Sequence, residues 1–243
     1  MIRCVSERVV VAKVAVIVLA LATSAAAVAQ TAGDVVEPLP PPTGLAPHFV
    51  PATSGTKAPD ADGFLQRWLL LEPISKPNRT NTLFTASYVR AALDPATYPG
   101  RFAALPRDGE IAAAPGAPRW HALDATAFDV RLFNLAQGLG KPTYGVIFWA
   151  VTIVNSPREM TGVRLAAGSN SASRWWLGST EVAGLFNDRR MVMDDVVSRP
   201  LTLHKGRNVL RGAVINGPGL SDFCVRFLDE SGHPIRDITT SVK

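Results

Sequence analysis

The feature that most constrains the fold is a rhythm of short apolar runs separated by turn residues in the last hundred residues. Phe223, Val225 and Phe227 fall on one side of the last run, and the intervening residues fall on the other. A period of two residues is what a strand with one buried face requires. The rhythm therefore predicts an antiparallel β-sandwich, with strands within 144–154, 162–167, 174–177, 201–203, 209–216 and 223–228.

The first 29 residues have the pattern of a secretory signal peptide. A basic segment with Arg3, Arg8 and Lys13 precedes an apolar run at 14–22, and the small residues Ala-Val-Ala at 27–29 form a cleavage site. The apolar run is shorter than the roughly 18 residues that a membrane-spanning helix needs. We therefore expect export to the periplasm or the exterior, with no membrane contact after cleavage.

Charge and cysteine content exclude several classes of function. Removing the signal peptide lowers the formal net charge from +5 to +3, because three basic residues and Glu7 leave with it. The remaining chain has no Lys/Arg block, so the clustered basic face of a nucleic-acid-binding protein is not predicted. Cys4 also leaves, and we interpret the remaining Cys224 as a small buried residue without a disulfide partner. No glycine-rich phosphate loop or Cys/His cluster is present, so we expect no cofactor and no metal.

The rest of the chain divides into a tether and one domain. Residues 30–62 hold seven of the nineteen prolines, a composition typical of an extended, disordered tether. The domain is expected over 63–243, and an apolar run at 64–72 predicts its first strand. A helix is predicted over 81–93, with Asn81 as its N-cap and Pro95 ending it. The predicted fold is thus mostly β, a sandwich with one short N-terminal helix.

Three motifs in the C-terminal half indicate a particular kind of sandwich. They read Gly-Ser-Asn-Ser at 168–171, Trp-Trp-Leu-Gly at 175–178 and Leu-His-Lys-Gly-Arg-Asn at 203–208. In order and spacing they resemble motifs of galactose-binding-like jelly-roll domains from secreted bacterial carbohydrate-active proteins, including stand-alone chains often labelled acetylxylan esterase. The resemblance covers about 144–237. Asn170 and Ser171 stand where those domains carry acidic residues, so a calcium site at that turn is not expected.

The resemblance implies a polysaccharide or oligosaccharide as ligand. An indole packs against the apolar face of a sugar, while Asn, Asp and Arg side chains bond its hydroxyl groups. Trp175 and Trp176 are consecutive on a predicted strand and must point to opposite faces. We predict that one of them is exposed in a cleft or at an interface; the alternative is that both are buried under a loop or the N-terminal helix. Asn170, Asp188 and Arg190 complete the predicted ligand-binding set.

An enzyme is the main alternative. An esterase needs an activated nucleophile, yet the Gly-x-Ser-x-Gly elbow is absent. Asp229 and His233 have the spacing of a weak acid–histidine pair, and Ser169 is a candidate nucleophile for a triad not evident in the sequence. The prediction is therefore a carbohydrate-binding module without catalytic residues, with a carbohydrate esterase and an envelope protein-interaction module as alternatives. The sequence does not predict an oligomeric state.

Overall fold

The computed structural model describes residues 44–78 and 84–243 of the chain. These residues belong to one compact unit, Leu39–Lys243. The predicted signal peptide (1–29), the first part of the predicted tether (30–43) and the predicted N-cap Asn81 lie outside the described residues.

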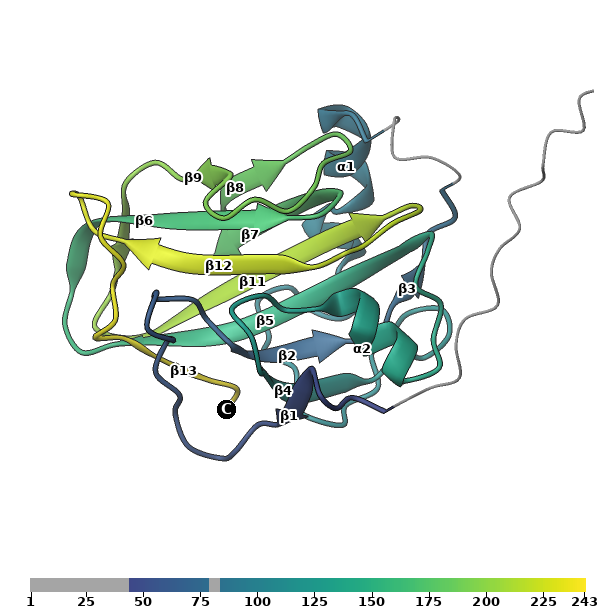
Figure 1. The fold of residues 1–243 in the computed structure, drawn as a ribbon, viewed down its shortest axis with the longest axis horizontal. Helices are drawn as coiled ribbons and strands as arrows, with labels where there is room; N and C mark the ends of the chain where they lie inside the picture. Colours follow the sequence, from purple (N-terminus) through teal and green to yellow (C-terminus); the bar gives the residue numbers. More distant parts are fainter. Residues whose placement is uncertain (1–43, 79–83) are drawn as a thin grey trace, which may run out of the picture. The chain divides into compact units, whose positions relative to one another are not determined.

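The described chain is mostly β, with all strands paired antiparallel in two sheets (Figure 1). The larger sheet runs in the order β1-β4-β2-β5-β11-β7-β8, with β3 and β13 also pairing with β5. The smaller sheet runs β10-β6-β12, and β9 pairs with β6. The strands of the larger sheet are β1 (Phe49–Pro51), β2 (Arg67–Leu71), β3 (Ile74–Ser75), β4 (Trp120–Ala125), β5 (Val146–Ser156), β7 (Ala172–Leu177), β8 (Thr180–Leu185), β11 (Gly206–Asn216) and β13 (Thr239–Ser241). Those of the smaller sheet are β6 (Met160–Ser169), β9 (Val196–Val197), β10 (Leu201–Leu203) and β12 (Phe223–Leu228).

Each of the six apolar runs read from the sequence contains a strand, which confirms the antiparallel β prediction. The runs correspond to β5, β6, β7, β10, β11 and β12. The predicted first strand also exists, as β2, and all five of its residues are buried. The apolar stretches at 102–105 and 111–114 are loops, apart from a single bridge between Ile111 and Arg119.

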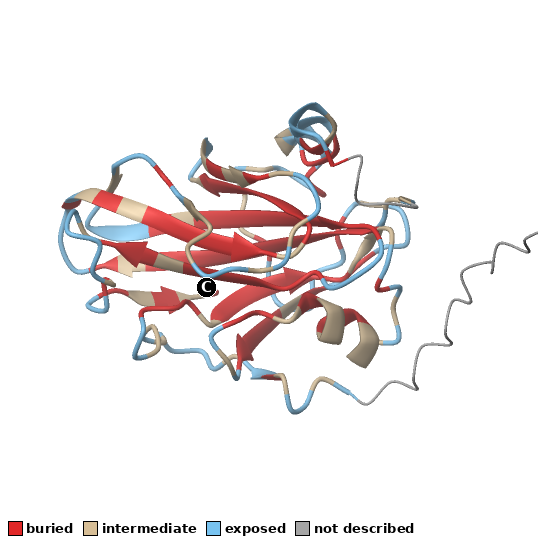
Figure 2. Cartoon of the chain, turned by 45° about the horizontal axis from the view of Figure 1, so that its top comes forward, coloured by how far each residue is buried: buried red, intermediate tan, exposed pale blue. Residues whose placement is uncertain are grey.

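The larger sheet is buried on both faces. One face packs against the smaller sheet around Trp68, Phe148 and Phe227, while the other packs against the segment 84–112 around Trp120 and Trp149. Most of the strand residues are therefore buried, and exposed residues gather in the loops (Figure 2). The double burial explains why β5 reads as a nearly continuous apolar run rather than as a strict alternation.

Two short α-helices flank the sheets. In α1 (Ala86–Ala92) the Thr85 hydroxyl caps the N-terminus by accepting the Tyr88 N–H at 3.3 Å, so the described helix begins after the predicted start. The helix ends before Pro95, as predicted, and a 3₁₀ turn, η2 (Pro95–Thr97), follows. The second helix, α2 (Leu132–Gly138), was not predicted, and its residues Leu132, Leu135 and Ala136 are buried.

Residues 44–62 are part of the fold, so the tether prediction is wrong for this stretch. Phe49 is buried and sits in β1, which pairs with β4. Arg67 donates to the Thr53 hydroxyl at 2.9 Å, and Lys57 bridges to Thr240. Apolar burial at one residue and hydrogen bonds to neighbouring strands order a segment whose composition is proline-rich.

Candidate functional site

Both tryptophans of the predicted site belong to the core. Trp175 and Trp176 point to opposite faces of β7, as predicted, but only 0% and 1% of their surfaces are exposed. Trp175 packs against Phe223 between the sheets, with ring centroids 5.1 Å apart, and Trp176 packs against Trp149 on the outer face at 5.7 Å. The expectation of one exposed tryptophan is therefore wrong, because the segment 84–112 covers the outer face of the sheet.

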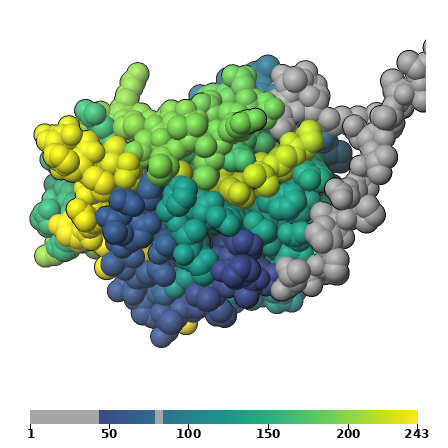
Figure 3. Space-filling view, in the orientation of Figure 1, coloured from purple at the N-terminus to yellow at the C-terminus, as the bar shows by residue number. Residues whose placement is uncertain are grey.

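The three predicted polar residues do meet, in one open cleft of about 930 Å³. Four segments far apart in the sequence form its walls: 129–134 at the start of α2, the β6–β7 turn at 170–171, the loop 188–191 after β8, and 218–222 before β12. Figure 3 shows the last segment as a yellow-green strip between the green loop after β8 and the teal α2 region. The cleft thus contains Asn170, Asp188 and Arg190 together with residues that the sequence analysis did not select.

Hydrogen bonds from Asn170 and Ser171 hold three of these segments together. The Asn170 N–H donates to the Asp222 carbonyl at 2.9 Å, and its side-chain oxygen accepts the Met191 N–H at 3.0 Å. The Ser171 N–H donates to the Arg189 carbonyl at 3.0 Å. Ser171 has a φ of +56°, the left-handed conformation that lets the chain reverse tightly between β6 and β7. Asn170 therefore shapes the cleft, and its side-chain NH₂ has no partner among the described residues.

Two buried carboxylates form the inner wall of the cleft. Asp129 is 6% exposed and pairs with Arg131, whose Nε lies 3.1 Å from Oδ2. Asp222 is 7% exposed. Its burial raises its pKa to about 6; the charge of Asp129 acts in the same direction, while the Phe133 N–H and Arg131 act against it. Near neutral pH the Asp222 carboxylate is thus a hydrogen-bond acceptor, and Arg131 only partly compensates its charge.

The outer wall carries exposed charged groups. Asp188 and Arg190 are both exposed, whereas the intervening Arg189 forms an ion pair with Asp195. The lining residues include three aspartates and three arginines, so their formal charges cancel when all are ionised. A cleft with this lining offers many donors and acceptors without a net charge, which suits a polar, uncharged ligand.

An exposed aromatic ring stands beside the cleft. Tyr144 is 47% exposed, and its ring lies 5.8 Å from that of Phe133, whose N–H faces Asp222 at 3.5 Å. The next residue, Gly145, contacts the Gly217 carbonyl at 3.4 Å, just before the 218–222 wall. Tyr144 is therefore a half-exposed aromatic ring near the cleft, outside the residues that line it.

The residues invoked for the esterase alternative do not form a site together in the described chain. Ser169 is fully buried, and its hydroxyl donates to the Ser173 hydroxyl at 2.8 Å. Asp229 and His233 are close, with Oδ2 and Nδ1 3.6 Å apart, but they lie in the exposed turn after β12. A serine sealed in the core cannot reach a substrate in the native state.

In the part of the chain that the structure describes, no group of three or more His, Cys, Asp or Glu side chains is arranged to hold a metal ion. Among the same residues, no helix is long and apolar enough to span a membrane.

No family model matches the chain, and neither does any curated protein. Solved structures align with it at low similarity, and two of them are PA14 domains. One is described as a PA14 sugar-binding domain from an RTX adhesin; its TM-score is 0.40, with 10% identity over 74% of this chain and 100% of that one. The other is the PA14 domain of the MpAFP antifreeze protein; its TM-score is 0.41, with 11% identity over 79% of this chain and 95% of that one.

Proposed function

We propose that this chain is an exported, non-catalytic carbohydrate-binding protein with a galactose-binding-like jelly-roll fold, and that the cleft around Asn170, Asp188 and Arg190 is its binding site. Export rests on the signal-peptide pattern of the first 29 residues. The fold assignment rests on the order of the three turn motifs. The choice of site rests on the geometry of the cleft alone.

The observation that carries the proposal is the convergence of polar side chains from four separate segments on one open cleft. Sugar hydroxyl groups both donate and accept, so a site needs carboxylates, amides and guanidinium groups close together. Asp222 and Asp188 supply acceptors, Arg131 and Arg190 supply donors, and the Asn134 amide supplies both. The balanced charge of the lining favours a neutral saccharide over an acidic one.

Tyr144 gives the proposed site its apolar element. A sugar bound in the cleft and extending past Asp222 would meet this half-exposed ring, which Phe133 supports from behind. An aromatic ring offers a large, rigid apolar surface on which the C–H face of a sugar can pack. The ligand is therefore expected to be an oligosaccharide long enough to reach both the polar cleft and the ring.

Isothermal titration with neutral plant and bacterial oligosaccharides of four to six units tests the proposal. We expect at least one xylo-, gluco-, manno- or galacto-oligosaccharide to bind the wild-type protein. Arg190→Gln removes a charged donor and should weaken that binding about 10- to 100-fold, while Arg199→Gln, an exposed arginine outside the cleft, should leave it unchanged. A folded protein that binds none of the panel contradicts the proposal, and so does equal binding by the two variants.

A further inference from the structure

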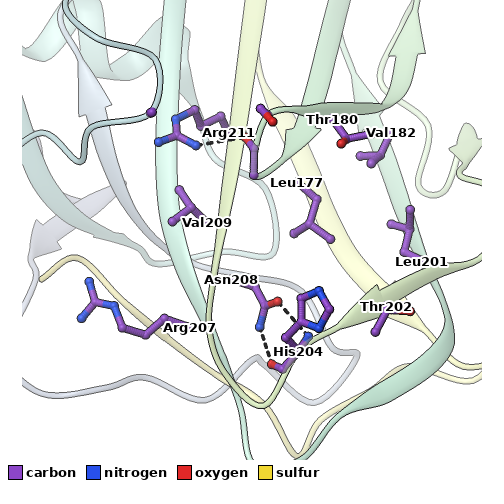
Figure 4. A pocket seen from close by; sticks show the side chains of 13 residues that line it. Leu177, Thr180, Val182, Leu201, Thr202, His204, Arg207, Asn208, Val209 and Arg211 are labelled. Atoms are coloured by element: carbon purple, nitrogen blue, oxygen red, sulfur yellow. Dashed lines mark hydrogen bonds between the residues drawn. The ribbon is translucent and has the colours of Figure 1, made fainter.

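A second cleft, of about 680 Å³, lies between the turn joining β7 to β8 and the turn joining β10 to β11. Figure 4 shows Arg211, Leu177 and Thr180 at one end of it and His204 and Asn208 at the other. Its charge differs from that of the first cleft. The lining includes two arginines and a histidine but no aspartate or glutamate.

Arg211 makes this cleft unusual because its charge is buried without an ionic partner. The side chain is 2% exposed, and no carboxylate in the described chain forms an ion pair with it. Its Nη1 and Nη2 donate to the carbonyls of Gly178 and Ala104 at 3.1 and 3.2 Å, and its Nε has no hydrogen-bond partner. A guanidinium is rarely buried in this way unless a counter-charge is close.

The neighbours of Arg211 stabilise the cation only in part. The Phe102 ring lies 4.9 Å from the guanidinium carbon, in the geometry of a cation–π contact. Tyr98 also acts on Arg211, but burial raises the pKa of Tyr98 to about 12, so its hydroxyl is neutral near pH 7. Burial itself lowers the pKa of Arg211. The protein thus supplies a ring and carbonyl dipoles but no negative charge.

We propose that this cleft binds an oxyanion, a carboxylate or sulfate group, with Arg211 as its counter-charge. The hydroxyl groups of Ser179 and Thr202 line the same cleft and can donate to the anion. The two other basic residues of the lining, Arg207 and His204, already have partners within the protein. Arg207 donates to the Lys243 carbonyl at 2.8 Å, and His204 lies 3.5 Å from the exposed Glu159. The inference is independent of the proposed saccharide site, because the two clefts share no lining residue.

Thermal unfolding at constant ionic strength tests this site. Sodium sulfate should raise the midpoint compared with sodium chloride, with the logarithm of the sulfate concentration above Kd and by roughly 5–10 °C at a hundredfold excess over Kd. Glucuronic acid and glucose, titrated separately, distinguish a free anion from an anionic sugar. Sulfate active alone indicates a small-anion site, and glucuronic acid binding more tightly than sulfate indicates an acidic saccharide; glucose should have no effect.

Two variants at an exposed residue test the site without destabilising the fold. Thr180 is exposed and lines the cleft, so Thr180→Glu places a carboxylate there without disturbing the core. We expect Thr180→Glu to weaken sulfate or glucuronate binding at least tenfold, and Thr180→Gln, its neutral match in length, to keep within threefold of wild type. If neither anion raises the midpoint of the wild type above that in sodium chloride, the inference is overturned, and unchanged binding in Thr180→Glu overturns it as well.

Discussion

Truncation of Trp175 tests whether the paired tryptophans are core rather than ligand platforms. The ring is fully buried against Trp68 and Phe223, with centroid distances of 6.2 and 5.1 Å, and its Nε1 donates to the Ser173 hydroxyl at 3.1 Å. The fit is tight, because a Cβ at Gly212 would lie 2.2 Å from the Trp175 ring. Trp175→Ala should therefore leave a cavity between the sheets, while the Ser173 hydroxyl keeps its hydrogen bond from the Ser169 hydroxyl.

The expected cost follows from this packing. Removing a buried tryptophan side chain costs about 3–5 kcal/mol, part of which comes from the aromatic pairs. For a unit of this size, 1 kcal/mol shifts the unfolding midpoint by about 2–4 °C, so Trp175→Ala should lower it by roughly 6–20 °C. Urea and thermal denaturation followed by circular dichroism measure this change. Arg190→Gln, on the exposed wall of the cleft, serves as the control and should stay within about 0.5 kcal/mol.

A loss below about 1 kcal/mol in Trp175→Ala would refute the core assignment. The smaller change Trp175→Phe keeps an aromatic ring between the sheets and should fold with a lower midpoint. Because no atom of residue 175 lines the saccharide cleft, this variant should bind the same oligosaccharide as wild type. Loss of binding in a folded Trp175→Phe protein would restore the tryptophan as a ligand contact.

Three further outcomes follow from the structure. Phe49→Ala should lower the free energy of unfolding by about 3–5 kcal/mol in urea denaturation, because Phe49 is only 3% exposed. An unchanged free energy would instead support the tether interpretation of residues 44–62. The pKa of Asp222, about 6 when folded, lies above its ordinary value of 3.8, so the native state binds more protons between these values and stability should fall as pH rises through that window. The free energy of unfolding should change by an amount on the order of 3 kcal/mol between pH 4 and pH 7, as measured by urea denaturation. In Asp222→Asn this change should disappear. Burial raises the pKa of Cys224 to about 12, so a thiol reagent at pH 8 should label it only after unfolding, and rapid labelling of the native protein would contradict its placement.

The strands could be predicted from the sequence because their signal is local. Apolar runs bounded by turn residues placed β5, β6, β7, β10, β11 and β12, and the alternation in β12 is visible without any partner. The sequence could not show that residues 44–62 belong to the folded domain, because their structure depends on contacts with distant residues. Phe49 pairs with Ala125, and Lys57 pairs with Thr240.

The candidate site, too, could be predicted only in part from the sequence. Polar residues in turns between strands usually face outward, and the structure places the three predicted polar residues, Asn170, Asp188 and Arg190, on one cleft. The exposure of Trp176 depends on what covers the outer face of the sheet, and that cover comes from residues 84–112, far away in the chain. Asp222 could not be selected from the sequence, because the bridge between Val130 and Phe223, which are far apart in the chain, brings it beside Asp129.

Amide chemical-shift mapping with the tightest-binding neutral oligosaccharide tests the central claim most directly. We predict that the shifts of amides in 131–134, 170–171, 188–191 and 219–222 change, together with those next to Tyr144, while the amides around Arg211 stay unchanged. Perturbations confined to any other face of the protein, or none at saturating oligosaccharide, would contradict the assignment of the cleft as the saccharide site.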